Sequence, residues 1–245
     1  MASAGQPVTA AAPVALVTGA SGLLGARVAD LLGRRGIPTA HHYANRNPSP
    51  APGLPQISVR ADLGNSSEVE AMMDEVRERL GPVGILVHCA ATAADGLIID
   101  QDEKTWREVV DVNLVGAYRV IRCALPSMVR RRYGRIVVAS SPSALRGVPG
   151  QSAYASAKAG LLGLVRTLAA EYAPRNILVN AVTPGFMDSE LTVDVSEQAR
   201  AAILARTVRN RPLDPALAAE AVLFLLDNDA VTGHNLVVDG GFSLC

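Results

Sequence analysis

Short continuous apolar runs alternate along the chain with longer segments whose apolar residues recur at helical spacing. The first run, Val14-Ala15-Leu16-Val17, is apolar at every position, which is typical of a strand buried on both faces. Similar runs predict further strands within 37–43, 56–60, 85–87, 135–139, 177–181 and 235–238. Helical patterns lie between them, within 26–35, 66–80, 102–120, 153–173 and 216–226. This alternation predicts an α/β fold, a doubly wound parallel sheet with helices on both faces.

The length of 245 residues, with 49% hydrophobic residues, fits one domain with a large core. Residues 1–13 are small and polar and include two prolines, so we expect a disordered lead before a single domain over 14–245. Segment 186–211 is amphipathic and has few fixed turn signals. We interpret it as a candidate lid over the substrate.

The formal net charge is zero and the pI is about 6.9, which argues against nucleic acid and against an anionic membrane surface as partners. No apolar run approaches the roughly 20 residues that span a bilayer, and the first residues lack the features of a signal peptide, so we expect a cytoplasmic protein. Cys89, Cys123 and Cys245 are an odd number without metal-type spacing. We expect neither a disulfide framework nor a metal site.

A glycine-rich turn, Thr18-Gly19-Ala20-Ser21-Gly22-Leu23-Leu24-Gly25, connects the first strand to the first helix. In that context, backbone N–H groups and the positive end of the helix can hold a pyrophosphate. The alternative is an ordinary tight turn. The strand-turn-helix context favours a dinucleotide bound to a Rossmann-type domain.

The second strand ends in Ala44-Asn45-Arg46-Asn47, where such folds contact the adenosine ribose. An acidic residue there would repel an added phosphate, but none is present, and Arg46 suits a 2′-phosphate. We therefore expect NADPH, with a solvent-facing arginine as the alternative.

Other strand ends supply further contacts to the cofactor. Asp62-Leu63 would lie against the adenine, and the small residue Ala90 would let the ribose approach. Thr183-Pro184-Gly185 turns the chain where a nicotinamide ring would lie.

Tyr154 and Lys158 are four residues apart in an alanine-rich helical segment, so both side chains should share one face. A nearby cation lowers the pKa of a phenol, and Tyr154 could then protonate a carbonyl oxygen that Ser141 holds in place. A lone Tyr-x-x-x-Lys is more often a packing tyrosine and a solvated lysine. However, only Lys104 and Lys158 are lysines among 23 basic residues, which favours a specific need for an ammonium here.

Asn113 falls inside a predicted helix, where its amide competes with the backbone. It indicates either a functional contact or a satisfied core amide.

Together these residues resemble the short-chain dehydrogenase/reductase family over about 14–242. The matching features include the glycine turn, Asp62-Leu63, Asn180, and the closing Val231-Thr232-Gly233 and Val238-Asp239-Gly240-Gly241. The resemblance implies that Tyr154 protonates the carbonyl and Ser141 orients it. It implies that Lys158 binds the nicotinamide ribose and lowers the tyrosine pKa, while Asn113 holds a water in a proton relay. The implied cofactor-binding residues are Gly19, Ser21, Gly22, Leu24, Gly25, Arg46, Asp62, Leu63, Ala90, Lys158, Pro184 and Gly185.

Within the family the chain is most similar to β-ketoacyl-acyl-carrier-protein reductases and polyketide ketoreductases. This implies an NADPH-dependent ketoreductase of a β-ketoacyl thioester, borne by an acyl carrier protein, in a homotetramer. Arg132 and Arg175 match positions that dock the acidic carrier beside the site. The alternative for Arg130-Arg131-Arg132 is a solvated helix cap.

Two motifs depart from the common family pattern. Leu23 replaces a glycine, and His88-Cys89-Ala90-Ala91 stands where Asn-Asn-Ala-Gly is usual. We interpret His88 as a structural replacement, and we expect both departures to bear on cofactor binding. The alternative functions are reduction or oxidation of a free alcohol, sugar or steroid, and a non-catalytic cofactor-binding relative.

Overall fold

The computed structural model describes residues 12–48, 50, 55–189, 192 and 195–244. Most of the predicted disordered lead, residues 1–11, lies outside the described residues, as does Cys245.

Seven strands form one parallel sheet in the order β3-β2-β1-β4-β5-β6-β7. They are β1 (Val14–Thr18), β2 (Thr39–Tyr43), β3 (Gln56–Arg60), β4 (Val83–His88), β5 (Gly134–Ala139), β6 (Ile177–Pro184) and β7 (Asn235–Val238). The chain winds outward from β1 in one direction and then returns to β4 to wind in the other. The predicted doubly wound fold is confirmed, and its switch point between β1 and β4 is where such sheets bind ligands.

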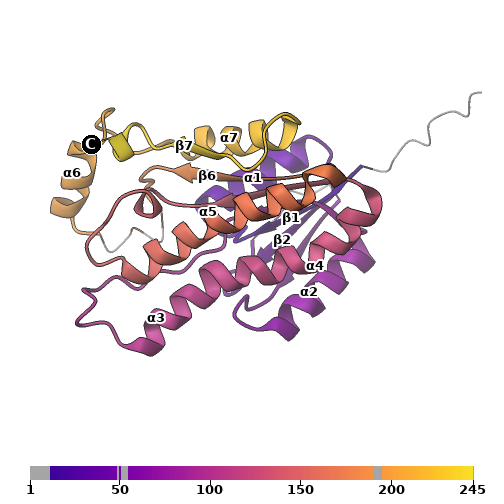
Figure 1. Ribbon diagram of the computed structural model, residues 1–245, viewed down its shortest axis with the longest axis horizontal. Coiled ribbons are helices and arrows are strands. Elements are labelled where there is room, and N and C mark those ends of the chain that lie inside the picture. The colour runs from indigo at the N-terminus through magenta and orange to yellow at the C-terminus, as the bar shows by residue number, and fades with distance from the viewer. Residues whose placement is uncertain (1–11, 49, 51–54, 190–191, 193–194, 245) are drawn as a thin grey trace, which may run out of the picture.

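Helices cover both faces of the sheet (Figure 1). One face carries α1 (Leu23–Arg34) and α7 (Pro215–Asp227), and the other carries α2 (Ser66–Arg79), α4 (Gly116–Arg131) and α5 (Ser152–Tyr172). Each face buries its own apolar cluster, so the continuous apolar runs of the central strands are explained by burial on both sides.

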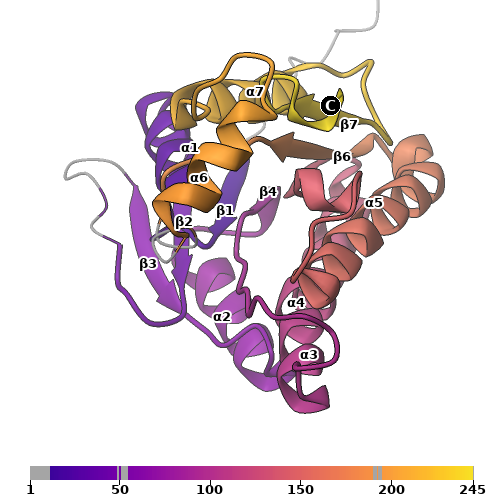
Figure 2. The ribbon, with the colours of Figure 1, turned by 90° about the vertical axis from the view of Figure 1, so that its left-hand side faces the viewer.

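The carboxyl ends of the strands meet at one edge of the sheet, which faces the viewer in Figure 2. The segments between strand and helix extend over this edge, with α3 (Glu103–Val110) and α6 (Glu197–Ala205) beside it. Side chains that follow β1, β4, β5 and β6 are therefore brought together here, although they are far apart in the sequence.

Segment 102–120 is not the single α-helix that its pattern predicts. Asp102 caps α3, a π-helical turn η1 (Asp111–Val115) follows, and α4 begins at Gly116. Single π-helical turns of this kind occur frequently at functional sites.

Segment 186–211 contains α6, whose first turn is capped by Ser196, and none of the residues of α6 is fully buried. Residues 190–191 and 193–194 of this segment lie outside the described residues. Its role as a lid stays a prediction.

Candidate active site

The glycine turn is shaped by close backbone packing. Gly19 has a φ of +66°, and a Cβ atom there would lie 2.7 Å from the backbone N of Ala90. Glycine is therefore required both by its conformation and by the approach of the turn to the end of β4. No side chain caps the first turn of α1 at Gly22, which leaves its N–H groups available to an anion.

Leu23 causes no conflict in this turn, although its position is usually a glycine. It is the first residue of α1 and lies in helical backbone, which any residue can adopt. Leu24 packs in the core, and Gly25 is buried close to the carbonyl of Gly19. The turn therefore keeps its close packing without a glycine at position 23.

His42 lines the cleft described below and supports the glycine turn, which the sequence patterns did not indicate. Its Nδ1 accepts the Gly19 N–H at 3.2 Å, so its Nε2 carries the proton and donates to the Ala61 carbonyl at 3.0 Å. Burial lowers the pKa of this imidazole, which keeps Nδ1 free to accept. His42 therefore ties the glycine turn to the end of β3. The only signal in the sequence was a pair of histidines in an otherwise apolar strand.

A cleft of about 1940 Å³ lies over the carboxyl ends of β1 to β4. Seven of the predicted cofactor-binding residues line it: Gly19, Ser21, Gly22, Arg46, Asp62, Leu63 and Ala90. Nη2 of Arg46 donates to the Ser21 carbonyl and so connects the end of β2 with the glycine turn. The size of the cleft, its glycine floor and its open helix end fit a dinucleotide.

Pro184 and Gly185 do not line this cleft. They end β6, where the Gly185 N–H donates to the Val238 carbonyl at 2.9 Å. A Cβ atom at Gly185 would lie 2.7 Å from the Cα of Asp239, so the chain passes close to the turn after β7. Both residues stand at the same sheet edge as Ser141, in the neighbouring strand connection.

The structure brings three of the four predicted catalytic residues together. Tyr154 and Lys158 occupy successive turns of α5, and the Lys158 Nζ lies 5.6 Å from the centroid of the Tyr154 ring. Ser141 follows β5, and its hydroxyl lies 2.6 Å from Oγ of Ser143 and is close enough to Tyr154 to influence the pKa of the phenol. Lys158 is 1% exposed and donates to the Ala139 carbonyl at 2.8 Å. The alternative interpretation, in which Lys158 is a solvated surface lysine, is therefore excluded.

The predicted direction of the tyrosine pKa shift is wrong for the protein's own groups. Burial raises the pKa of Tyr154 to about 12, and the hydrogen bond with Ser141 only partly opposes this shift. Lys158 contributes no resolved lowering of the Tyr154 pKa, and burial lowers the pKa of Lys158 itself to about 8. Desolvation dominates both shifts, and the spacing of the two residues along the chain does not reveal it.

Asn113 lies in the middle of the π-helical turn and is fully buried. Its Nδ2 donates to the carbonyls of Thr92 and Val109, both at 2.7 Å. Its Oδ1 is buried and has no hydrogen-bond partner within the described ranges. The amide is thus fixed with an acceptor unused, which fits the predicted contact to a water better than a satisfied core amide.

His88 is structural, as predicted. It is fully buried on β4, and its Nδ1 lies 2.9 Å from Oγ1 of Thr18, which also accepts the Ala90 N–H. Burial lowers the pKa of His88 to about 3, so it stays neutral. Cys89 beside it is a free thiol whose pKa burial raises to about 12, which makes it unreactive.

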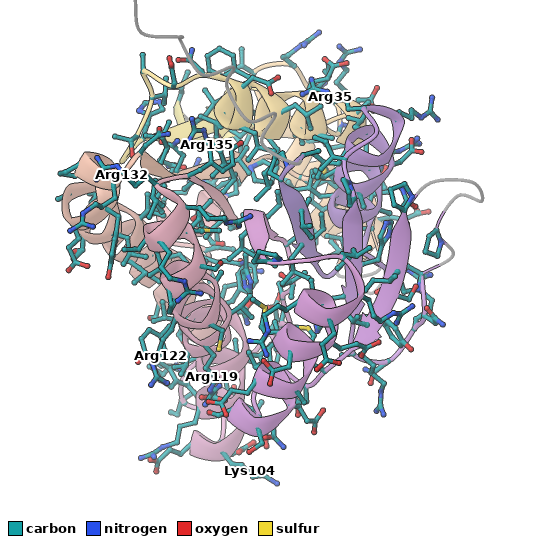
Figure 3. All side chains as sticks on the ribbon, turned by 90° about the vertical axis from the view of Figure 1, so that its right-hand side faces the viewer. Arg35, Lys104, Arg119, Arg122, Arg132 and Arg135 are labelled. Carbon is teal, nitrogen blue, oxygen red and sulfur yellow. The ribbon has the colours of Figure 1, made fainter. Side chains whose placement is uncertain are left out.

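Arg132 and Arg175 do not lie beside this site in the same chain. Arg132 ends α4 before β5 begins, and its Nη2 donates to the Pro174 carbonyl in the turn η3 (Ala173–Arg175) before β6. Figure 3 shows Arg132 on the face at the amino ends of the strands. Helix α5 separates Tyr154 from Arg175 by about 30 Å at 1.5 Å per residue. The match of sequence positions did not reveal that the two arginines occupy the opposite edge of the sheet.

Neither a metal centre nor a membrane helix is found in the described ranges. They contain no group of three or more His, Cys, Asp or Glu side chains that could hold a metal ion. They also contain no helix that is long and apolar enough to cross a membrane.

A doubly wound sheet with a glycine turn at its switch point, and a serine, tyrosine and lysine at the same edge, defines a class of oxidoreductases that use a nicotinamide dinucleotide. Comparisons with known proteins identify the family. The family described as enoyl-(acyl carrier protein) reductase matches residues 19–243. The chain belongs to the short-chain dehydrogenase/reductase family.

Individual relatives are similar over nearly their whole length. The chain is 33% identical to the 3-oxoacyl-[acyl-carrier-protein] reductase FabG of Escherichia coli, over 93% of this chain and 96% of the relative. It is 35% identical to FabG of Staphylococcus aureus with the same coverage.

Solved structures show the same fold. A crystal structure of a tryptophan variant of actinorhodin polyketide ketoreductase with NADPH has a TM-score of 0.86 and 30% identity, over 95% of this chain and 97% of that one. A putative gluconate dehydrogenase from Agrobacterium tumefaciens has a TM-score of 0.87 and 28% identity, over 95% and 96%.

Proposed function

We propose that this enzyme reduces a β-ketoacyl thioester to the β-hydroxyacyl thioester with NADPH. The observation that carries the proposal is that the buried Lys158 and the half-buried Ser141 and Tyr154 lie together at the carboxyl edge, next to a cleft that fits the dinucleotide. NADPH would supply the hydride to the carbonyl carbon. The residues of the chain would hold the carbonyl oxygen and give it a proton.

Tyr154 is suited to the role of proton donor. With a pKa raised to about 12, its phenol is fully protonated at neutral pH, and it lies close to the hydroxyl of Ser141. A carbonyl oxygen placed between the two hydroxyl groups could accept from both, and it would take the proton of Tyr154 as negative charge develops. The buried ammonium of Lys158 would stabilise the phenolate that remains. Asn113 Oδ1 could accept from a water that returns the proton.

The choice of NADPH rests on the residues at the end of β2. Arg46 lines the cleft beside Ser21 and is a donor for a 2′-phosphate, and no acidic residue stands in 44–47 to repel one. The actinorhodin ketoreductase structure contains NADPH, which supports the same choice.

The acyl substrate is supported by the relatives and by the loop before α3. The FabG relatives carry names that specify a 3-oxoacyl group on an acyl carrier protein. In this chain Leu97, Ile98 and Ile99 are exposed, the last two by 73% and 86%. The loop is held to the start of α5 by the bond from Gly96 N to Gly150 O, at 2.9 Å. An apolar loop near Tyr154 suits an alkyl chain better than a polyol.

We retain a carrier-borne substrate in this proposal, but not docking at Arg132 and Arg175 of the same chain, because α5 separates them from Tyr154. The proposed setting is the cytoplasm, and the proposed assembly is a homotetramer, which light scattering can test.

The test is the oxidation of NADPH, followed at 340 nm, with a β-ketoacyl thioester either free or attached to a carrier protein. We expect turnover with NADPH, a much weaker rate with NADH, and a higher kcat/KM on the carrier. Turnover of gluconate-type polyols but not of the thioester would favour the second candidate, a dehydrogenase of free polyols, which the likeness to the gluconate dehydrogenase supports. Binding of NADPH without turnover of any ketone or alcohol would favour a non-catalytic relative.

A further inference from the structure

One arginine on α4 joins three separate elements through residues that line the cleft, Leu63, Ser66 and Asp111. The guanidinium of Arg119 pairs with both carboxylate oxygens of Asp111, with distances of 2.9 Å and 3.0 Å. The same Nη1 donates to the Leu63 carbonyl at 2.9 Å, and Nε donates to Oγ of Ser66 at 3.1 Å. Arg119 therefore connects the first residue of the π-helical turn with the end of β3 and the start of α2.

The ion pair of Arg119 with Asp111 can fix the relative positions of the elements that it joins. The side chain of Arg119 is only 17% exposed, and the two-pronged contact with a carboxylate fixes orientation as well as distance. The exposed ion pair of Arg77 with Asp74 on α2 has neither property. A lysine could not make the same set of contacts, because it lacks the planar fork.

The π-helical turn needs such support, because it is a rare conformation in which each N–H bonds to the carbonyl five residues earlier. It is also wedged on two sides. A Cβ at Gly116 would lie 2.9 Å from Cβ of Leu63, and a Cβ at Gly160 of α5 would lie 2.7 Å from Cδ2 of Leu114. The turn thus lies between the end of β3 and the catalytic helix, with Asn113 at its centre.

We propose that Arg119 and Asp111 form a positioning pair that holds this turn and thereby fixes the unused Oδ1 of Asn113. The pair would link the adenine end of the cleft, through Leu63, to the catalytic end. Its effect on catalysis rests on the proposed function, in which Asn113 takes part in proton return. Neither Arg119 nor Asp111 would contact the substrate.

The catalytic test uses Arg119→Met, the milder Arg119→Lys and Asp111→Asn, with Arg122→Met as a matched control on an exposed position of the same helix. We expect the first and third variants to lower kcat about tenfold, which is within the range of coupling between distant residues. The dissociation constant of NADPH, measured by fluorescence, should change much less. Arg122→Met should behave as the wild type.

A double-mutant cycle with Asn113→Ala separates positioning from a general loss of stability. If Arg119 acts through Asn113, Arg119→Met should lower kcat little further once Asn113 is removed. Fully additive effects, or an unchanged kcat in Arg119→Met, would overturn the proposal.

Hydrogen exchange provides a readout that needs no substrate. Arg119→Met should speed amide exchange in 109–116, and Arg122→Met should not. Unchanged exchange there would refute the positioning role whatever the enzyme reduces. Faster exchange in a protein that turns over no ketone would instead leave the positioning role standing and count against the proposed function.

Discussion

The Lys158 ammonium lies 5.6 Å from the centroid of the Tyr154 ring and is directed to the carbonyl of Ala139. Burial disfavours the charged form of each group, because it raises the pKa of the phenol to about 12 and lowers that of the ammonium to about 8. At neutral pH the site therefore contains a protonated Tyr154 beside a lysine that loses its charge near pH 8.

The pH dependence of reduction should follow Lys158. Because its pKa is lowered to about 8, the ammonium is charged below that pH and loses its charge above it, whereas Tyr154 remains protonated throughout. We expect kcat/KM to be level below about pH 8 and to fall as the pH rises further, since this parameter reports the free enzyme. Steady-state rates between pH 6 and 10 would check this. A profile that is level up to pH 10 would contradict it.

Removing the hydroxyl groups should affect the chemical step and leave cofactor binding intact. Tyr154→Phe should lower kcat by about 10² or more, because the phenol is the group that gives its proton to the carbonyl oxygen in the proposed reaction. Ser141→Ala should cost about 10²-fold through loss of a donor to the carbonyl oxygen. The measurement is kcat together with the NADPH dissociation constant. Tyr118→Phe, at a half-exposed position on α4, is the control and should retain full activity.

Arg46 should decide between the two nicotinamide cofactors. Arg46→Ala should raise KM for NADPH about tenfold or more, since a charge-assisted hydrogen bond contributes about 1.5–3 kcal/mol. KM for NADH should stay nearly constant, because NADH has no 2′-phosphate. Parallel kinetics with both cofactors provide the comparison, with the exposed Arg77→Ala as control. Equal increases in KM for NADPH and NADH would show that Arg46 acts only by holding the glycine turn through its hydrogen bond to the Ser21 carbonyl.

Burial of the Lys158 ammonium should lower the free energy of unfolding relative to that of a variant with an apolar side chain at this position. Between pH 8 and 10.5 the unfolded chain holds a proton on Lys158 that the folded protein has lost, so stability of the wild type rises with pH across this window. Below pH 8 Lys158 is charged in both the folded and the unfolded state, so the full desolvation penalty of the buried ammonium lowers the free energy of unfolding. Lys158→Met should therefore be inactive but more stable at pH 7, with an advantage that shrinks by roughly 3 kcal/mol toward pH 10.5.

Urea unfolding at several pH values between 7 and 10 would measure this advantage. Lys104→Met, which changes a lysine with a side chain 85% exposed, should show little change in stability at any pH. A Lys158→Met variant that is less stable than the wild type at pH 7 would show that the bond to the Ala139 carbonyl outweighs desolvation.

The sequence by itself determined the alternation of strands and helices, the glycine turn and the identities of Ser141, Tyr154 and Lys158. These features depend on local periodicity and on short spacings, such as the single helical turn between Tyr154 and Lys158. The burial of the central strands on both faces also followed from their unbroken apolar runs.

Only the tertiary structure decided the features that depend on distant contacts. His42 reaches Gly19 across 23 positions, and Arg119 reaches Leu63 across 56. The raised pKa of Tyr154 comes from burial, which no local pattern measures. Arg132 and Arg175 were expected beside the site, but strand direction and the length of α5 place them at the opposite edge of the sheet. Spacing along a chain predicts neighbours within an element, whereas desolvation and the meeting of separate elements are set by how the whole chain packs.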